Sequence, residues 1–148
     1  HYIMTKVNAY LNFNGNCEEA FKFYKSIFGG EFPYIGRYKD MPPMEGQPPL
    51  PESEQNKIMH VSLPISEETI LMGADTMTGF GPETSFGNNI SLILSPDTKD
   101  EADRLFNELS AGGAITMPIE TTFWGAYFGM LIDKFGINWM ISFEERQG

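Results

Sequence analysis

The second half of this sequence repeats the order of secondary-structure signals found in the first half. In the first half, β-forming and polar residues alternate over 7–13, which predicts a strand. A capping sequence at 16–19 then opens a run of apolar residues at helical spacing, and Gly29-Gly30 follows that run. These signals predict a helix between the cap and the glycine pair.

The same signals return in the second half as a strand at 89–94, a cap at 98–101 and the pair Gly112-Gly113. Each predicted helix is followed by three strand-like stretches, which lie near 31–38, 56–64 and 68–75 in the first half and near 114–121, 125–133 and 137–143 in the second. The repeated order is therefore β-α-β-β-β, and each copy is one supersecondary unit.

We predict an α+β fold of two βαβββ modules in one chain, at 4–76 and 87–146, joined by a linker at 77–86. The helix of each module should cover one face of its sheet, so that the two sheets form an open, barrel-like pair around a cavity. Residues 1–3 precede Met4 and are interpreted as a cloning remnant.

A proline-rich segment interrupts the repeat between the second and third strands of the first module. Five of the ten prolines lie between Lys39 and Asn56, together with Gly46. Because proline fixes φ and lacks a backbone donor, we expect no helix or strand in this segment. Such a loop is either a lid or dimer contact or a solvated insertion, and the sequence leaves both interpretations open.

Charge and cysteine content narrow the classes of partner and compartment. Twenty acidic residues oppose ten basic ones, and the resulting charge of −10 repels nucleic acid and anionic lipid. Cys17 is the one cysteine, so no disulfide can form within the chain, as is typical of a reducing compartment. No apolar run reaches the roughly 18 residues of a membrane span, and no secretion signal is visible. We expect a cytoplasmic protein that binds neither nucleic acid nor membrane.

Several motifs spread over nearly the whole chain resemble one known family. They are Tyr10-Leu11-Asn12-Phe13-Asn14-Gly15-Asn16, Glu19-Ala20-Phe21-Lys22-Phe23-Tyr24, Phe28-Gly29-Gly30, Met59-His60, Gly73-Ala74-Asp75, Trp124-Gly125-Ala126-Tyr127-Phe128-Gly129 and Asp133-Lys134-Phe135-Gly136-Ile137-Asn138-Trp139-Met140-Ile141. Together they resemble the PhnB-like branch of the vicinal-oxygen-chelate superfamily, which includes glyoxalases, bleomycin-resistance proteins and dioxygenases. The resemblance implies the fold predicted above and a homodimer.

Members of this branch are often labelled as methyltransferase domains. A nucleotide-bearing methyl donor would need a glycine-rich turn from strand to helix, followed by an acidic residue, and the sequence has no such turn. We therefore expect no cofactor.

The resemblance also implies where a metal would bind. Superfamily enzymes hold a divalent metal with histidine and glutamate on the first and last strands of each module. Carried over by strand position, these places fall on Asn8 and Met72 in the first module and on Asn89 and Met140 in the second. Neutral amides and thioethers are poor ligands for a hard or borderline divalent cation. We therefore expect no superfamily metal site.

His60 is the leading candidate for chemistry, because the only other histidine is His1. Strand alternation places it on the cavity side together with Ile58 and Ser62. There the imidazole is suited to act as a general base or to hydrogen-bond a ligand. The alternative is a structural histidine bonded to a neighbouring strand. Asp75 is the second candidate, either as the group that orients His60 or as a turn-capping carboxylate.

Amide, aromatic and thioether side chains share the cavity side of the predicted strands. The predicted pocket residues are Asn8, Tyr10, Asn12, Met72, Asn89, Phe128, Met130 and Met140. Such a wall suits a flat or apolar organic ligand, which the asparagines and His60 would orient. The alternative is a filled core between the two sheets.

The sequence therefore supports two functional hypotheses. The first is a metal-independent protein that binds a small organic molecule in an apolar pocket, as the bleomycin-resistance relatives do. Its acidic surface favours a cationic ligand. The second is a lyase, isomerase or dioxygenase-like enzyme that uses His60 with or without a divalent metal.

Overall fold

The protein divides into two compact units, His1–Ser85 and Phe86–Gly148. This computed structural model describes residues 5–42, 45–46, 48–79 and 81–144. The predicted cloning remnant at residues 1–3 lies outside the described residues. No helix in the described ranges is long and apolar enough to cross a membrane.

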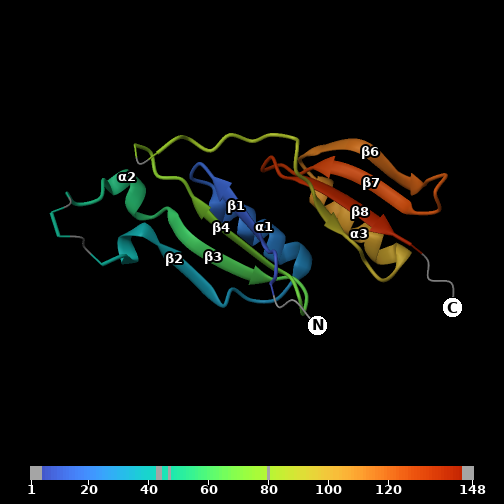
Figure 1. Ribbon diagram of the computed structural model, residues 1–148, viewed down its shortest axis with the longest axis horizontal. Coiled ribbons are helices and arrows are strands. Elements are labelled where there is room, and N and C mark those ends of the chain that lie inside the picture. Colours follow the sequence, from blue (N-terminus) through green and yellow to red (C-terminus); the bar gives the residue numbers. More distant parts are fainter. Residues whose placement is uncertain (1–4, 43–44, 47, 80, 145–148) are drawn as a thin grey trace. The chain divides into compact units, whose positions relative to one another are not determined.

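The first unit is a four-stranded mixed sheet with a helix on one face (Figure 1). Its elements are β1 (Ala9–Phe13), α1 (Cys17–Phe28), β2 (Tyr34–Arg37), the 3-10 helix η1 (Tyr38–Asp40), α2 (Glu52–Gln55), β3 (Ile58–Pro64) and β4 (Ile70–Asp75). The strand order is β1-β4-β3-β2. β1 pairs with β4 in parallel, and the other two pairs are antiparallel. The first strand of the module thus lies beside its last strand.

The second unit repeats this arrangement. Its elements are β5 (Leu92–Leu94), α3 (Lys99–Ser110), β6 (Ala114–Thr121), β7 (Tyr127–Ile132) and β8 (Asn138–Phe143). The strand order is β5-β8-β7-β6, with β5 and β8 parallel and the other pairs antiparallel. The predicted α+β fold of two βαβββ modules is confirmed. β5 begins at Leu92, later than predicted, and the cavity expected between the sheets stays a prediction.

The proline-rich segment between β2 and β3 is more ordered than predicted. η1 and α2 lie within it, so the expectation of no helix over 39–56 is wrong. α2 begins directly after Pro51, where the missing proline N–H is not needed. Glu54 anchors α2, because its carboxylate accepts hydrogen bonds from Lys57 Nζ at 2.8 Å and from the Thr78 N–H at 2.6 Å.

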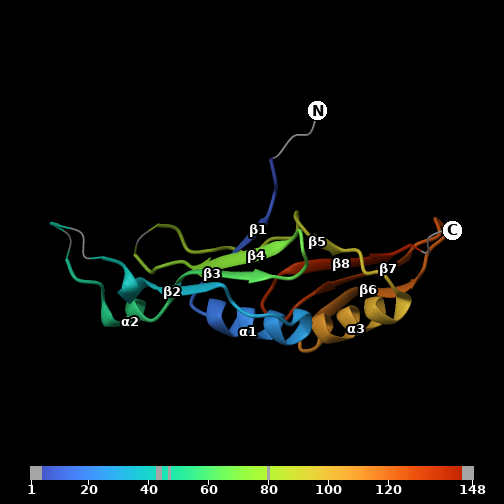
Figure 2. The ribbon, with the colours of Figure 1, turned by 90° about the horizontal axis from the view of Figure 1, so that it is seen from below.

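An aromatic cluster joins α1 to the first sheet. Phe21 packs edge-on against Phe13 of β1 and against Tyr24, with ring centroids 6.3 Å and 5.6 Å apart. Gly73 of β4 makes room for this ring, since a Cβ there would lie 2.6 Å from the Phe21 ring. Figure 2 shows α1 along one face of the sheet, and no helix lies on the opposite face in the described part of this unit.

The second unit uses the same device to seat its helix. Phe106 of α3 lies over Gly129 of β7, where a Cβ would come within 2.6 Å of the phenylalanine ring. Trp139 of β8 is 1% exposed, and its Nε1–H donates to Asp133 Oδ2 at 2.8 Å. The indole thereby satisfies its one polar group inside the core.

The two long helices begin differently, although the sequence predicted the same cap for both. Thr98 Oγ1 accepts a hydrogen bond from the Glu101 N–H at 3.1 Å, as predicted for α3. Asn16 makes no such side-chain bond at the start of α1. Instead, Asp75 Oδ1 accepts the Cys17 N–H at 2.9 Å. The predicted cap of α1 is wrong, because a carboxylate from β4 takes the place of the local amide.

Candidate functional site

One row of paired residues crosses the open face of the first sheet, which is the face opposite α1. Tyr10 pairs with Met72, Met72 with Ser62, and Ser62 with Tyr34. Tyr10 is 44% exposed, whereas its neighbour Leu11 is 9% exposed and points to the core. The structure therefore places Tyr10 and Met72 together on the open face.

His60 lies between two tyrosine rings on this face. Its Nδ1 atom is 3.1 Å from Tyr10 Oη, in a hydrogen bond whose donor depends on the imidazole tautomer. The centroid of the imidazole is 5.6 Å from that of Tyr10 and 5.8 Å from that of Tyr34. Within the described ranges, Tyr10 is the one hydrogen-bond partner of the His60 side chain. Nε2 has no hydrogen-bond partner among the residues that the structure describes.

Gly36 allows Tyr34 to lie over the sheet. Gly36 pairs with His60 across β2 and β3. A Cβ at Gly36 would lie 2.5 Å from Tyr34 Oη, so the phenol fills the space that a side chain would take. Beyond this pair the register shifts, and Ile58 is 1% exposed rather than on the open face as predicted.

Asp75 supports the backbone around the site. It is 2% exposed, and its two carboxylate oxygens accept the N–H groups of Cys17 and Ile58, each at 2.9 Å. Its main-chain carbonyl accepts a hydrogen bond from Tyr38 Oη at 2.7 Å. These contacts cap the start of α1 and of β3 rather than the local turn after Asp75, and a role in orienting His60 stays a prediction.

Burial keeps the phenols and the thiol in this region protonated. The pKa of Tyr10 is raised by burial and then by the neighbouring Cys17. The pKa of Tyr38 is likewise raised, first by burial and then by Tyr10. Cys17 is 0% exposed, and burial, followed by the Asp75 carboxylate, raises the pKa of its thiol. The phenols are thus neutral near pH 7, and the thiol is not a nucleophile.

The open face of the second sheet, opposite α3, carries softer side chains. A row in register crosses it from β5 to β6: Ile93, Met140, Met130 and Met117. Gly129, which faces α3, separates Met130 from Phe128, so alternation puts both of these on the open face. The Phe128 ring lies 5.8 Å from that of Trp124, which is 53% exposed.

The three predicted asparagines occupy different settings. Asn12 is exposed in β1 and pairs with Ala74 of β4, on the same side as Tyr10. Asn8 and Asn89 are exposed but precede β1 and β5. Strand alternation therefore does not fix where they point, and their place in a pocket stays a prediction.

The positions that carry metal ligands in the superfamily do not offer a donor set for a hard divalent cation. Asn8 and Asn89 lie outside the strands, and Met72 and Met140 present thioethers. The described residues also contain no group of three or more His, Cys, Asp or Glu side chains placed to hold a metal. These positions do not fit the superfamily metal, and we propose no step through it.

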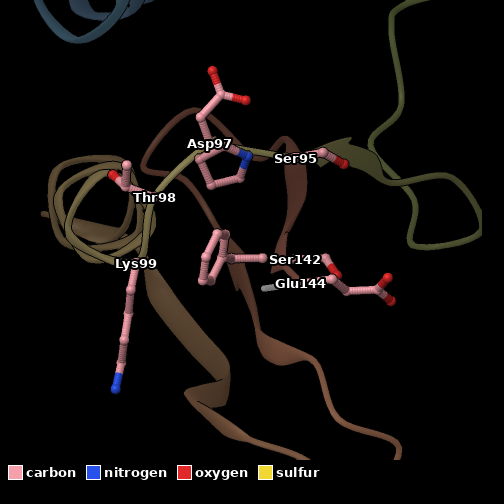
Figure 3. Close-up of a pocket in the computed structure, with 8 residues that line it drawn as sticks. Ser95, Asp97, Thr98, Lys99, Ser142 and Glu144 are labelled. Carbon is pink, nitrogen blue, oxygen red and sulfur yellow. The ribbon is translucent and has the colours of Figure 1, made fainter. Parts of the chain in front are cut away.

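A cavity of about 840 Å³ opens in the second unit, between the β5–α3 connection and the end of β8 (Figure 3). Its lining includes Ser95, Ser142 and the charged Asp97, Lys99 and Glu144. The charged ends of these three side chains point away from one another (Figure 3). None of the predicted pocket residues lines this cavity, so it is a separate feature that the sequence did not indicate.

Tyr34 and Tyr38 belong to the site but were not predicted. Tyr34 alternates with Ile35 in a predicted strand, and Gly36 follows it. A glycine in a strand marks a close approach by another group, which is the one signal that could have identified Tyr34. Tyr38 reaches Asp75 across the fold, and no local pattern predicts that contact.

The chain is similar to known proteins over nearly its whole length. The sequence profile of the 3-demethylubiquinone-9 3-methyltransferase family matches residues 5–142. Protein YjdN from Escherichia coli (strain K12) is 31% identical over 146 residues, which cover 95% of this chain and 97% of YjdN.

Solved structures agree with this assignment. Protein PA1353 from Pseudomonas aeruginosa has 37% identity and a TM-score of 0.81, over 96% of this chain and 99% of that chain. The PhnB protein from Bacillus cereus has 29% identity and a TM-score of 0.73, over 94% and 99%. A glyoxylase/bleomycin resistance protein/dioxygenase domain from Frankia sp. EAN1pec shares the fold, with 15% identity, a TM-score of 0.65 and coverage of 97% and 100%. The chain therefore belongs to the 3-demethylubiquinone-9 3-methyltransferase (PhnB-like) family, and it shares the fold of a glyoxylase/bleomycin resistance protein/dioxygenase domain.

Proposed function

We propose that this protein binds a small organic molecule at Tyr10, His60 and Tyr34, without the superfamily metal. The observation that carries the proposal is the imidazole of His60 between two half-exposed tyrosine rings, with Nδ1 engaged by Tyr10. Aromatic walls with a few placed polar groups are typical of small-molecule sites. Nε2 supplies the polar group, and the rings supply the apolar contact area.

The site is organised before a ligand arrives. The bond from Tyr10 to Nδ1 restrains the imidazole, and Gly36 holds space for the Tyr34 ring. A site that needs little ordering on binding loses less affinity to conformational entropy.

The methionine row of the second sheet offers another surface for apolar groups, because thioether side chains adapt to irregular shapes.

The proposal can be tested by titrating isotope-labelled protein with neutral ring compounds, such as phenol and indole, and following the His60 and tyrosine ring signals by NMR. We expect shifts at Tyr10, His60 and Tyr34 that are lost in the variants His60→Gln and Tyr34→Leu. Phe123→Leu is the matched control, because Phe123 is an aromatic residue that is 98% exposed on a hairpin tip. Shifts that persist in both site variants would refute this location, and no shifts with any compound would refute the proposal.

A second candidate function is catalysis by His60 as a general base. The contact between Tyr10 Oη and Nδ1 favours it, because a partner at one imidazole nitrogen directs the other nitrogen toward a substrate. His60→Gln separates the two functions once a ligand is known. Retained binding with lost turnover supports an enzyme, whereas absence of turnover in both proteins supports a binding protein.

Methyl transfer is not part of the proposal, although the family description names it. The turn between β1 and α1 is where a nucleotide-binding fold holds its cofactor. In this chain the N–H groups of Gly15 and Cys17 at that turn both donate to Asp75 Oδ1 at 2.9 Å. The turn therefore satisfies its donors with a side chain of the protein, and it does not fit a nucleotide-bearing methyl donor.

A further inference from the structure

We infer that the ligand of this site is an organic cation held over the rings of Tyr10 and Tyr34. The inference rests on the proposed function and specifies its ligand class. Three features carry it: the absence of a lysine or arginine side chain from the strands on this face, the exposure of the two phenol rings, and the space that Gly36 leaves for one of them.

The strands of the first sheet direct no lysine or arginine side chain to its open face. Arg37 is the one lysine or arginine in the four strands of this sheet. Its guanidinium turns to α1 and the loop, donating to Glu18 Oε2 at 2.7 Å and to the Asn56 carbonyl at 2.8 Å. The net charge of −10 adds a field that repels anions and attracts cations. A carboxylate, phosphate or phosphonate would therefore meet no lysine or arginine side chain from these four strands on the open face.

Both phenol rings belong to residues that are about half exposed to solvent. Tyr10 and Tyr34 are 44% and 48% exposed. Their planes are inclined by 31° and 42° to the imidazole plane, so the three rings form a shallow tilted set rather than a parallel stack. Tyr10 stays a neutral phenol, because burial raises its pKa. A cation within about 6 Å of such ring centroids is attracted by their quadrupoles.

Gly36 makes the position of Tyr34 testable without removing the ring. A Cβ at Gly36 would meet the Tyr34 hydroxyl at 2.5 Å, the ring carbon that bears it at 2.9 Å, and no backbone atom among its three closest contacts. Since the clash falls on the far end of a flexible side chain, Gly36→Ala should turn Tyr34 away and leave the sheet intact.

The experiment compares choline with 3,3-dimethyl-1-butanol, which has the same shape but no charge. NMR titration of the wild-type protein should give choline about tenfold the affinity of the alcohol, as expected for a cation over two tyrosine rings. Tyr34→Phe keeps the ring and should keep the preference. Tyr34→Leu and Gly36→Ala should both reduce it severalfold, because the Tyr10 ring alone then remains.

Equal affinity for choline and the alcohol would overturn the inference, as would a preference that survives both Tyr34→Leu and Gly36→Ala. If Gly36→Ala does not fold, Tyr34→Leu against Tyr34→Phe decides the outcome alone. Titration with the neutral ring compounds distinguishes failure of the cation inference from failure of the proposed function. If they bind at His60 and choline does not, only the cation inference fails, whereas if neither class binds, the proposed function fails as well.

Discussion

The carboxylate of Asp75, at the end of β4, accepts a hydrogen bond from the backbone N–H of Cys17, at the start of α1. Its other oxygen accepts the N–H of Ile58, where β3 begins. One buried side chain therefore ties together three segments of the first unit. The open face with His60 is built on these strands, so Asp75 holds the frame of the site.

Replacement of Asp75 by Asn should destabilise the protein without a large change in shape. Asn keeps one acceptor oxygen, so a buried N–H that now meets a carboxylate oxygen would lose its partner. A hydrogen bond to a charged group contributes about 2 kcal/mol, and we expect a loss of that order in the free energy of unfolding. Urea unfolding measures it, with the exposed Asp97→Asn as control. Unchanged stability together with lost ligand binding would instead support Asp75 as the residue that orients His60.

Cys17 should resist alkylation until the protein unfolds. The thiol is buried and its pKa is raised, so the thiolate is rare and out of reach. Above about pH 8.5 the unfolded chain loses the thiol proton while the folded protein keeps it. The free energy of unfolding should therefore fall as pH rises above that value, and less steeply in Cys17→Ala. Rapid reaction of the native protein with iodoacetamide at pH 7.5 would contradict this account.

The pair Glu18 and Arg37 should contribute to acid stability. The hydrogen bond from Arg37, more than any other contact, lowers the pKa of the Glu18 carboxyl. A lowered pKa means that this stabilisation is present above the usual carboxyl value of about 4.3 and is lost as pH falls below it. Glu18→Gln should flatten the pH dependence of the melting temperature below pH 5. The exposed Glu67→Gln is the control, and an equal effect of both changes would count against the pair.

We expect the protein to form a homodimer. β2 and β6 end their sheets, and neither pairs with a further strand in the described structure. Unpaired strand edges are commonly covered by a partner. Sedimentation should give a mass near twice the 16.7 kDa of the chain at micromolar concentrations. A single species of one chain mass throughout that range would contradict the expectation.

The sequence predicted the order of elements because the signals for strands and helices are local. Strand alternation placed Tyr10 on the open face and separated it from the core residue Leu11, and the family resemblance placed Met72 on that same face. The alternation failed at Ile58, where a register shift moves the side chain into the core. Alternation assumes an unbroken strand, and nothing local announces the shift.

Contacts between distant residues account for the other differences. Asn16 fits the sequence pattern of a helix cap, but the capping hydrogen bond at the start of α1 is accepted by Asp75. No spacing rule in the sequence relates Asp75 to α1. α2 forms after Pro51 because Glu54 is anchored by groups that follow it in the chain. The position of the Tyr34 ring depends likewise on space that the neighbouring residues leave unfilled. Tertiary packing determines these features, and the pattern of a short stretch of sequence does not reveal it.

The different starts of the two long helices imply a difference in folding kinetics. Thr98 caps α3 through a residue three positions away, whereas Asp75 caps α1 from 58 positions away. A local cap can form while the rest of the chain is still unfolded, but a distant one requires closure of a long loop. We therefore expect α3 to be structured early in the transition state, and α1 to gain its start only when β4 has docked. Two copies of one architecture would then fold in a fixed temporal order, with the C-terminal copy first.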